Sequence, residues 1–436
     1  MSDSFTSNTI IPWTATVLAP NGNILLPGVA ASTEKLEISA SVNSLYIFGE
    51  WIFSTSPVTT AGGVPIQAQA IGNLIEAGLI SVGTTIEFNF APTDGVPTIL
   101  DLGVLAILNG PGPDAISLAP SYRIILISTW YFAQVIGSHA YQGSVSSIII
   151  DMMNSEVIGV SPNSTLIWGE TIDSKDNPMF THYRTMMTPG KFMEERLIMY
   201  VKGNEGTPTF VYSNIDDRFE IMDYHRLASL PSYTAIDPSH PDLPNYQDIF
   251  NDPTQSTSMI LTIGMILDYN KGKRELWALS SPSSVFMYHI YGAVKEGPDD
   301  PVLVPLSTID PQKWEYITNT KDPNAITKVY LDDSLHDYEE IATEASYEYA
   351  KALMDSRSFT LVCLPNLNVK IGRACSLHIT NRNESTASLF FQDYLISEVS
   401  QLFVGLRCHT HITLTAPTQI YTSLSDVAGY FNRNDH

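Results

Sequence analysis

Two histidines near the C-terminal end of the chain are the best candidate for chemistry. His409 and His411 stand two positions apart in LRCHTHITLTA, where apolar and polar residues alternate. Such alternation predicts a β-strand, and residues two apart on a strand point to the same face. Both imidazoles could therefore reach one metal ion. Two ligands do not complete a site, and the sequence forces no carboxylate beside them, so we favour an exposed polar strand face.

The three cysteines offer no better metal site. Cys363, Cys375 and Cys408 are odd in number, and their spacings match no zinc pattern. His378 with Cys375 is a weaker pair than the two histidines. This cysteine usage indicates folding in a reducing cytosol without a disulfide framework. We therefore predict no metal-ligating residue and no cofactor.

Paired carboxylates are the next candidates, because neighbouring acids can do general acid–base chemistry. Glu194–Glu195 and Glu339–Glu340 fall on predicted helix surfaces, and Asp216–Asp217 falls at a predicted hairpin tip. With 46 acidic residues in the chain, such neighbours arise by chance. We interpret the glutamate pairs as solvated helix faces and the aspartate pair as turn residues.

Motif searches give no catalytic constellation. The sequence contains no G-x-S-x-G elbow, no P-loop, no H-E-x-x-H and no G-x-G-x-x-G opening a helix after a strand. The run Trp130–Phe132 could form a platform for a sugar, but a loop that closes a core is the favoured interpretation. We predict that the protein is not an enzyme and has no catalytic residues, and we leave its binding residues open.

Charge and composition exclude further classes. The chain has 436 residues, 44% of them hydrophobic, and a formal net charge of -23. Binding nucleic acid by neutralising phosphates needs clustered Lys and Arg, and no basic run occurs. The acidity suits either a protein that lets DNA pass without holding it or simple solubility. No apolar stretch nears the length of a membrane helix, and the first residues lack signal-peptide features, so we expect a soluble protein.

The elements that must position these residues begin with β-structure over residues 1–115. Turn signals such as Gly110–Pro113 separate short segments rich in β-branched and aromatic residues. This pattern predicts a barrel or a sandwich, with a short helix or loop at 69–79. The expected strands are 14–18, 35–38, 44–53, 85–90 and 104–108.

Residues 116–230 predict a compact α/β unit. A strand at 122–127 precedes a helix at 144–158, whose inner face would hold Ile148, Met152 and Ser155. A second helix starts at 188, where Thr188 suits the N-cap and Pro189 the first helical position. Its apolar stripe consists of Phe192, Met193, Leu197, Tyr200 and Val201, and Gly203 ends it. Two strands, 208–212 and 218–222, follow around a turn.

The second half of the chain predicts a loop-rich region and then a return to β-structure. Residues 231–255 are polar and proline-rich, strands resume at 258–267 and 284–291, and 292–330 is again loop-rich. A helix from about 334 to 355 precedes a β-rich tail from 359 to 416. In that tail, the alternation predicts that one set of side chains faces one way and the other set faces the opposite way: Leu406, Cys408, Thr410, Ile412 and Leu414 against Arg407, His409, His411 and Thr413.

Three segments, 121–153, 187–227 and 364–380, carry a resemblance to a known family. They resemble the hub proteins of contractile injection machines, which include the baseplate hubs of T4-like and Mu-like phages. The family also includes the N-terminal half of the valine–glycine repeat spike proteins of type VI secretion. The matching residues are Ala140, Tyr141 and Gly143 before a helix, Thr188, Pro189 and Phe192 at the next helix, Phe219 after a turn, and Ile371–Gly372 in a turn after the long helix.

The resemblance implies a fold class that is α+β and β-dominated, with two tube-like β-barrel domains and inserted α/β domains. Four domains follow along the chain. Residues 1–115 form the first barrel, 116–230 the α/β insertion, 231–330 a loop-rich mixed domain with strands, and 331–436 a helix with the second barrel. The linkers 231–255 and 292–330 depart from the shorter members of the family.

The resemblance also implies a function and partners. The chain would be a structural virion protein, the central baseplate hub of a contractile phage tail, assembled in the host cytoplasm. As a homotrimer it would present six barrels, adapt a threefold central spike to a sixfold tail tube and line the DNA channel. Its partners would be the spike, tube or tube-initiator proteins and baseplate wedge proteins. Two alternatives stay open: a sixfold tube component, and a carbohydrate-binding tail protein.

Overall fold

The computed structural model describes residues 10–19, 22–30, 35–54, 68–91, 97–111, 120–160, 166–171, 180–198, 201, 209–223, 230–236, 257–266, 284–289, 302–305, 329–332, 358–378 and 393–415. The predicted helix at 334–355, with Glu339 and Glu340, lies outside these residues, as do Tyr200 and Gly203.

The N-terminal part of the chain forms an antiparallel sheet in the order β3-β4-β7-β6-β5-β1-β2. Apolar and polar residues alternate along its strands, so one side chain in two enters the core, as in WTATVL of β1. The predicted strands are confirmed, and the segment at 69–79 is a helix, α2 (Ala68–Glu76). The strands are β1 (Trp13–Leu18), β2 (Ile24–Ala30), β3 (Lys35–Ser41), β4 (Phe48–Ser54), β5 (Thr85–Phe90), β6 (Thr98–Pro111) and β7 (Pro120–Ser128).

The C-terminal part of the chain closes a six-stranded barrel. Its ring runs β13-β14-β18-β21-β20-β19 and returns to β13, because β19 pairs with both β20 and β13. Closure leaves no unpaired edge within the ring. The strands are β13 (Tyr233–Ile236), β14 (Thr257–Ile266), β18 (Ser358–Cys363), β19 (Ala374–His378), β20 (Asp393–Val404) and β21 (Arg407–Thr415). The first strand of this ring, β13, lies within residues 231–255, which the sequence predicts as a loop or linker. That prediction was wrong for Tyr233–Ile236, because this segment pairs with both β14 and β19.

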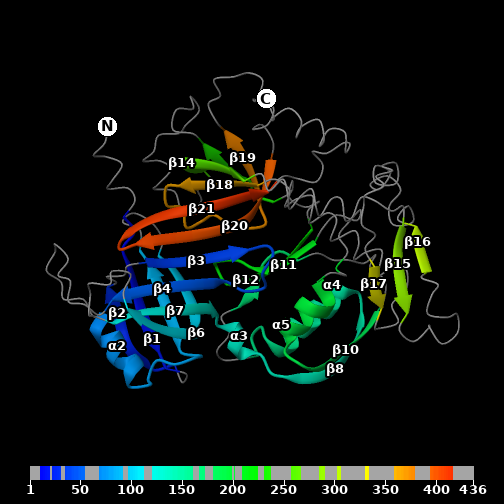
Figure 1. Cartoon of the computed structure of the whole chain (residues 1–436), viewed down its shortest axis with the longest axis horizontal. Coiled ribbons are helices and arrows are strands. Elements are labelled where there is room, and N and C mark those ends of the chain that lie inside the picture. The colour runs from blue at the N-terminus through cyan, green and yellow to red at the C-terminus, as the bar shows by residue number, and fades with distance from the viewer. Residues whose placement is uncertain are drawn as a thin grey trace.

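One long hairpin, β20–β21, belongs to both barrels, and we call it the shared hairpin. Near its open end β20 pairs with β19. Toward its tip β20 pairs with β3, from Glu398 with Ser41 to Phe403 with Leu36, which joins both barrels into one 13-stranded sheet. At the tip Arg407 bridges to Ile10, just before β1. The first barrel therefore closes through the hairpin as β1-β5-β6-β7-β4-β3-β20-β21 (Figure 1).

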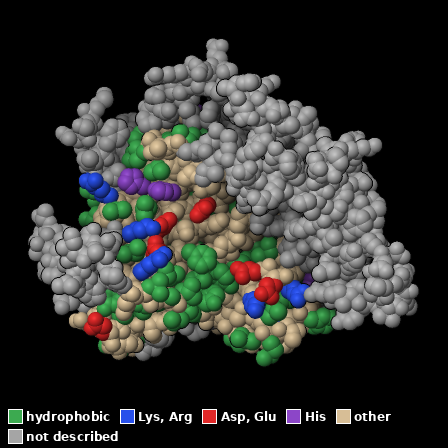
Figure 2. All heavy atoms as spheres, in the orientation of Figure 1, with side chains coloured by type: hydrophobic (Ala, Val, Ile, Leu, Met, Phe, Trp, Pro, Cys, Tyr) green, Lys and Arg blue, Asp and Glu red, His purple; other side chains and the backbone are tan. Residues whose placement is uncertain are grey.

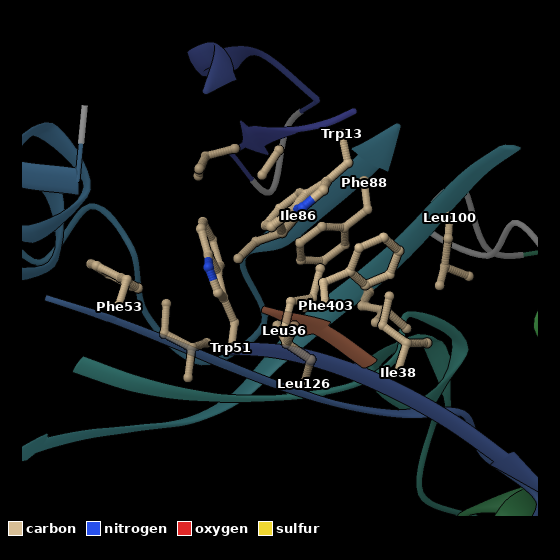
Figure 3. Packing of buried hydrophobic residues seen from close by; sticks show 14 of the residues in the cluster. Trp13, Leu36, Ile38, Trp51, Phe53, Ile86, Phe88, Leu100, Leu126 and Phe403 are labelled. Carbon is tan, nitrogen blue, oxygen red and sulfur yellow. The ribbon is translucent and has the colours of Figure 1, made fainter. Parts of the chain in front are cut away.

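Aromatic side chains fill the first barrel (Figure 3). Trp13 and Trp51 meet edge to face with ring centroids 6.2 Å apart, and Trp13 lies 5.9 Å from both Phe88 and Phe403. Phe403 comes from β20, so the shared hairpin supplies part of this core. Burying such rings removes a large apolar area from water, and edge-to-face pairs add about 0.5–1.5 kcal/mol beyond that burial.

An α/β unit lies between the barrels in the chain. It begins with a helical turn, α3 (Trp130–Ala133), and its ribbon pairs β8 with β10. A small sheet has the order β11-β12-β9. The remaining elements are β8 (Gly137–Gly143), α4 (Val145–Glu156), β9 (Ile167–Trp168), β10 (Phe180–Met187), α5 (Pro189–Phe192), η1 (Met193–Leu197), β11 (Thr209–Ser213) and β12 (Arg218–Asp223).

Capping in this unit follows the sequence, but two details of the predicted helices were wrong. Thr188 Oγ1 accepts from the Lys191 amide at 3.3 Å, with Pro189 in the first turn, as predicted. The helix then continues as the π-helical turn η1 instead of a regular α-helix. In α4, Ser155 is exposed, whereas Ile148 and Met152 are buried as predicted. Ile149 and Met153 complete that buried face, because a wide apolar stripe spans neighbouring positions.

A separate three-stranded sheet, β16-β15-β17, consists of β15 (Ser284–His289), β16 (Val302–Pro305) and β17 (Val329–Asp332). The predicted strand at 284–291 is thus confirmed. The fold class is also confirmed: a β-dominated α+β chain with two barrels and an α/β unit. Where the chain divides into domains stays a proposal; β7 pairs with β4 and β6 of the first barrel. Within the described ranges, no helix has the length and apolar character to cross a membrane.

Candidate functional site at the shared hairpin

His409 and His411 lie on one face of β21, as the alternation predicts. Cys408, Thr410 and Ile412 between and beyond them are buried in the barrels. Partial burial lowers the pKa of His409, and the neighbouring His411 and Arg407 lower it further. In the parts of the chain that the structure describes, no group of three or more His, Cys, Asp or Glu residues could hold a metal ion.

The weaker pair, Cys375 and His378, is not brought together. Cys375 is buried in the core, whereas His378, on the same strand β19, is half-buried. Residues three apart on a strand point to opposite faces. All three cysteines are buried, and none forms a disulfide with a described residue. Burial raises the pKa of Cys363 and Cys408, so these two stay protonated thiols at neutral pH.

The carboxylate pairs lie apart from each other. Glu194 and Glu195 are in η1, where burial and Glu195 raise the pKa of Glu194, and Glu195 lies 3.6 Å from Lys191 one turn earlier. Asp216 occupies the turn between β11 and β12, as its turn propensity predicts, but it also bonds beyond that turn. Its carboxylate lies 2.5 Å from Lys370 and 3.1 Å from Arg218.

The aromatic run at 130–132 closes a core. Trp130 is buried, stacks on Tyr46 with centroids 4.4 Å apart and meets Phe219 edge to face at 5.9 Å. Its indole Nε1 donates to Ser213 Oγ at 3.3 Å. The interpretation as a core-closing segment is confirmed, although the segment is the helical turn α3. A platform for a sugar would need that ring at the surface.

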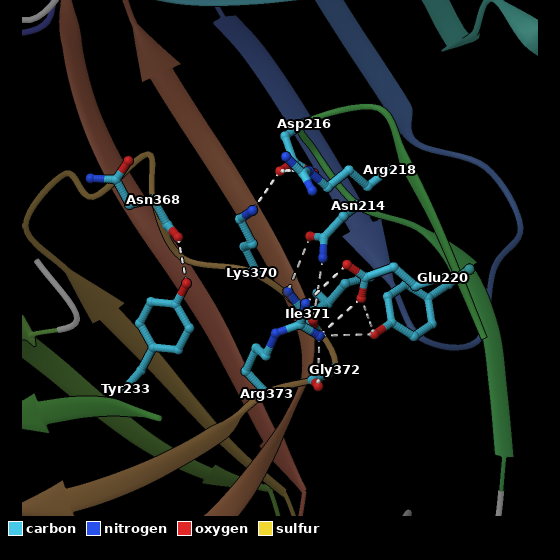
Figure 4. A network of polar contacts seen from close by, with 11 residues as sticks. Asn214, Asp216, Arg218, Glu220, Tyr233, Asn368, Lys370, Ile371, Gly372 and Arg373 are labelled. Atoms are coloured by element: carbon cyan, nitrogen blue, oxygen red, sulfur yellow. Dashed lines mark hydrogen bonds and ion pairs between the residues drawn. The ribbon is translucent and has the colours of Figure 1, made fainter. Parts of the chain in front are cut away.

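A buried ion pair connects the α/β unit to the second barrel (Figure 4). Arg373, just before β19, makes two parallel bonds of 2.9 Å to Glu220 of β12. Tyr212 of β11 donates its hydroxyl to the same carboxylate at 2.8 Å. Burial raises the pKa of Tyr212. Burial disfavours the charge on Arg373, but its hydrogen bonds to Glu220 outweigh this and raise its pKa. Arg373 and Glu220 thus form a two-bonded ion pair in the interior.

Further polar bonds surround this pair, and we call the whole set the joint. Asn214 exchanges two hydrogen bonds with the backbone of Ile371, at 3.4 and 3.3 Å. Tyr233 donates to the carbonyl of Asn368 at 2.7 Å. Gly372 has φ of +71°, and a Cβ there would lie 1.7 Å from the Tyr212 hydroxyl, so only glycine fits. The sequence showed Ile371–Gly372 as a turn; it could not show partners some 150 positions away.

The sheet face that points away from the barrel interiors carries a group of charged side chains (Figure 2). We call it the outer face; it holds the outward residues of β7, β4, β3, β20 and β21. Lys35 pairs with Glu37 at 2.6 Å and with Glu50 at 3.0 Å, and Arg123 pairs with Glu50. Glu37 also accepts from Ser400 Oγ at 3.0 Å, across from β3 to β20.

Beyond these ion pairs, the outer face ends in a basic row. Arg407, His409 and His411 follow one another on β21, and none of them forms an ion pair with a described residue. Glu398 on β20 is close enough to Glu37 for the two charges to interact, and burial together with that neighbour raises the pKa of Glu398. The outer face is therefore close to neutral, in a chain whose net charge is -23.

Solved structures of phage tail proteins are similar in fold to this chain. The 43 kDa tail protein of prophage MuSo2 from Shewanella oneidensis superposes with a TM-score of 0.51 at 9% identity, over 92% of this chain and 98% of that one. A tail protein from Neisseria meningitidis gives 0.49 at 9% identity, over 93% and 96%. A prophage tail protein from Listeria monocytogenes gives 0.44 at 9%, over 96% and 99%. No protein-family model and no curated protein matches the chain.

At 9% identity, the MuSo2 tail protein shares its fold with this chain over almost the whole of both chains. The resemblance expected from the three sequence segments is thus confirmed at the level of fold.

Proposed function

We propose that this protein is a structural component of a phage-type tail, and that it forms the central hub of a contractile baseplate. The observation that carries the proposal is the pair of barrels closed through one shared hairpin, in a chain with the fold of a prophage tail protein. Fold alone does not determine function, so the proposal also needs a physical task that this architecture performs.

That task is a change of symmetry. A threefold spike and a sixfold tube cannot bond at every subunit unless one side presents quasi-equivalent copies. A trimer of chains with two barrels each supplies six similar units. Because β3 and β20 continue one sheet across the two barrels, their relative placement is fixed within each chain. Fixed spacing between neighbouring barrels is what a ring of six requires.

The partners follow from this position in a tail. The spike would bind on one side of the ring, tube or tube-initiator proteins on the other, and wedge proteins around the α/β units. DNA would pass through the middle of a virion component assembled in the host cytoplasm. The net charge of -23 supports passage without retention, because like charges repel.

We propose no covalent chemistry for the protein. Among the described candidates, the glutamates of η1 are partly exposed, Asp216 belongs to the joint, and Trp130 fills a core. The burial of Trp130 argues against a sugar platform built on that ring. Function then resides in extended interfaces, which for obligate assemblies bury on the order of 2,000 Å² or more.

Light scattering on the purified chain, alone and co-expressed with a candidate spike protein, tests the proposal. We expect a trimer, either alone or in the presence of the spike. A stable hexameric ring would instead indicate the sixfold tube component. A monomer under both conditions would contradict an assembly role for the shared hairpin. A glycan-release assay adds a second check, because any turnover would contradict the absence of chemistry.

A further inference from the structure

The first barrel carries a second surface where charges of one sign lie together, on β5 and β6, away from the basic row. Glu87 of β5 and Asp101 of β6 lie directly opposite each other in register, with their side chains on the outside of the barrel. Like charges across a strand pair are destabilising. Neither carboxylate forms an ion pair with a described residue, and Asp101 Oδ1 is buried without a hydrogen-bond partner.

The basic row likewise holds side chains of one charge type without a described counter-ion. Arg407, His409 and His411 stand two positions apart on β21, so their side chains follow one another at about 7 Å. They are the positive groups of the outer face that lack a described counter-ion, whereas Lys35 and Arg123 are paired. The row spans about 13 Å, long enough to cover a cross-strand carboxylate pair whose Cβ atoms are about 5 Å apart.

One copy of the chain cannot join these two surfaces. In the ring of eight strands, β21 is followed by β1, then by β5 and β6. The basic row and the acidic pair therefore point outward in directions roughly a third of a turn apart. Two different patches on one subunit, facing different directions, suit a heterologous contact, which closes a ring when it repeats.

We propose that the outer face of the shared hairpin is a contact between copies of this chain, in which Arg407, His409 and His411 of one copy face Glu87 and Asp101 of the next. The contact rests on the proposed ring of chains and adds which surfaces meet. Charge complementarity selects a second copy: a chain of net charge -23 repels itself except where an unpaired basic row meets an acidic pair.

Nucleic acid is the other anionic occupant, and the surroundings of the row disfavour it. Glu37, Glu50 and Glu398 share the same face, so phosphates approaching the row would also meet carboxylates. The row offers one guanidinium, that of Arg407, and the two imidazoles of His409 and His411. A carboxylate pair needs only that one charge and two imidazole donors.

Site-directed crosslinking tests the contact in the full chain. The double variant Glu87→Cys/Arg407→Cys should form interchain disulfides under mild oxidation and give covalent oligomers on a denaturing gel. Each single variant should stay monomeric there, because a heterologous contact brings Glu87 of one copy to Arg407 of the next, never to its own equivalent. The native cysteines are buried, so their background is low.

Charge reversal gives a second readout that does not depend on new thiols. Arg407→Glu and Glu87→Lys should each weaken self-association at least tenfold in light scattering or analytical ultracentrifugation, and the combined variant should restore it. Circular dichroism must show an unchanged fold. Failure of the combined variant to restore association would overturn the contact, and so would a loss of DNA binding in Arg407→Glu with association unchanged.

The two experiments distinguish a failure of the proposed contact from a failure of the proposed hub function. A trimer in light scattering without crosslinks in the double variant would overturn the contact and leave the hub. Crosslinks within a stable hexamer would support the contact and contradict the hub. Absence of both association and crosslinks, with and without the spike, would overturn the contact.

Discussion

The interior of the first barrel and the joint are both buried, but they are built from opposite chemistry. The barrel interior is an apolar cluster in which Trp13, Trp51 and Phe403 pack ring against ring. The joint places a charged pair, Arg373 and Glu220, in the interior and surrounds it with directed hydrogen bonds. Hydrophobic burial has no preferred direction, whereas a guanidinium that donates two parallel hydrogen bonds to a carboxylate allows only one geometry of the pair.

This difference separates stability from placement. The aromatic cluster supplies free energy of folding, since each ring removed from water contributes whatever its exact orientation. A buried ion pair is weak evidence for stability, because desolvation offsets the attraction. The joint connects β11 and β12 of the α/β unit to the turn before β19, so we infer that it fixes the angle between that unit and the second barrel.

Removing a ring from the barrel should have the largest effect. Trp51→Ala should lower the free energy of unfolding by about 3–5 kcal/mol, because a void replaces a fully buried side chain. Urea denaturation followed by fluorescence measures this. Tyr131→Ala, at a partly exposed ring, is the control and should change it by less than about 1 kcal/mol. A loss below that in Trp51→Ala would mean that the cluster is not the main source of stability.

Breaking the ion pair from one side should come next. Glu220→Ala leaves the buried Arg373 guanidinium without its carboxylate, and we expect a loss of about 3 kcal/mol. Glu195→Ala removes a partly exposed carboxylate and should cost less than about 0.5 kcal/mol. Equal effects of the two variants in urea denaturation would show that the joint is solvated.

The glycine of the joint allows a test with a matched control. Gly372→Ala adds a Cβ at φ +71° that meets the Tyr212 hydroxyl, whereas Gly405→Ala adds one at φ +61° with nothing within 4 Å. Gly405→Ala should cost about 1 kcal/mol for the left-handed backbone alone, and Gly372→Ala about 2–3 kcal/mol. Thermal unfolding measures both. Identical losses would mean that Tyr212 moves aside freely.

Replacing both partners of the ion pair sharpens the comparison further. Glu220→Leu with Arg373→Met should leave the free energy of unfolding within about 1 kcal/mol of the parent, because apolar packing can replace a buried pair. If the joint fixes an angle, hydrogen exchange should nevertheless rise in β11 and β12. Unchanged exchange together with unchanged stability would show that packing alone holds the α/β unit in place.

Local patterns predicted the elements well, because alternation and capping depend on neighbouring residues. The strands around Trp13 and His411 and the Thr188 cap depend only on positions within four or five residues. The wider apolar stripe of α4 and the π-helical turn after Phe192 depend on packing against other elements, and there the sequence misled us.

Long-range partners could not be predicted in the same way. Nothing near Arg373 marks Glu220 as its partner, since both appear in the sequence as ordinary charged residues. Nothing in LRCHTHITLTA shows that its hairpin completes two barrels, because the bridge to Ile10 closes a loop of almost 400 residues. Only the resemblance to a family indicated two barrels; no periodicity of the chain did.

The smallest effect is expected at Asp101, which lacks the partner that every charge of the joint has. Burial, together with the neighbouring charge of Glu87, raises the pKa of Asp101 from an ordinary value of 3.8 to about 6. The folded state therefore holds this proton more tightly than the unfolded state. The ionised carboxylate opposes folding above pH 6, and stability recovers as the pH falls from about 6 toward 4. Asp101→Asn should then stabilise the dilute monomer at pH 7.5 by about 1 kcal/mol, discounted for partial solvation.

Urea denaturation at pH 7.5 and pH 4 measures that gain, which should vanish at the lower pH. Glu195→Gln, at a partly exposed carboxylate beside Lys191, is the matched control substitution. If copies of the chain meet at Asp101, the same substitution should also weaken self-association at high protein concentration. Asp101 would then destabilise the single chain and strengthen the assembly. The first barrel would combine an apolar interior, like its aromatic cluster, with surface charges that are paired only when a second copy binds.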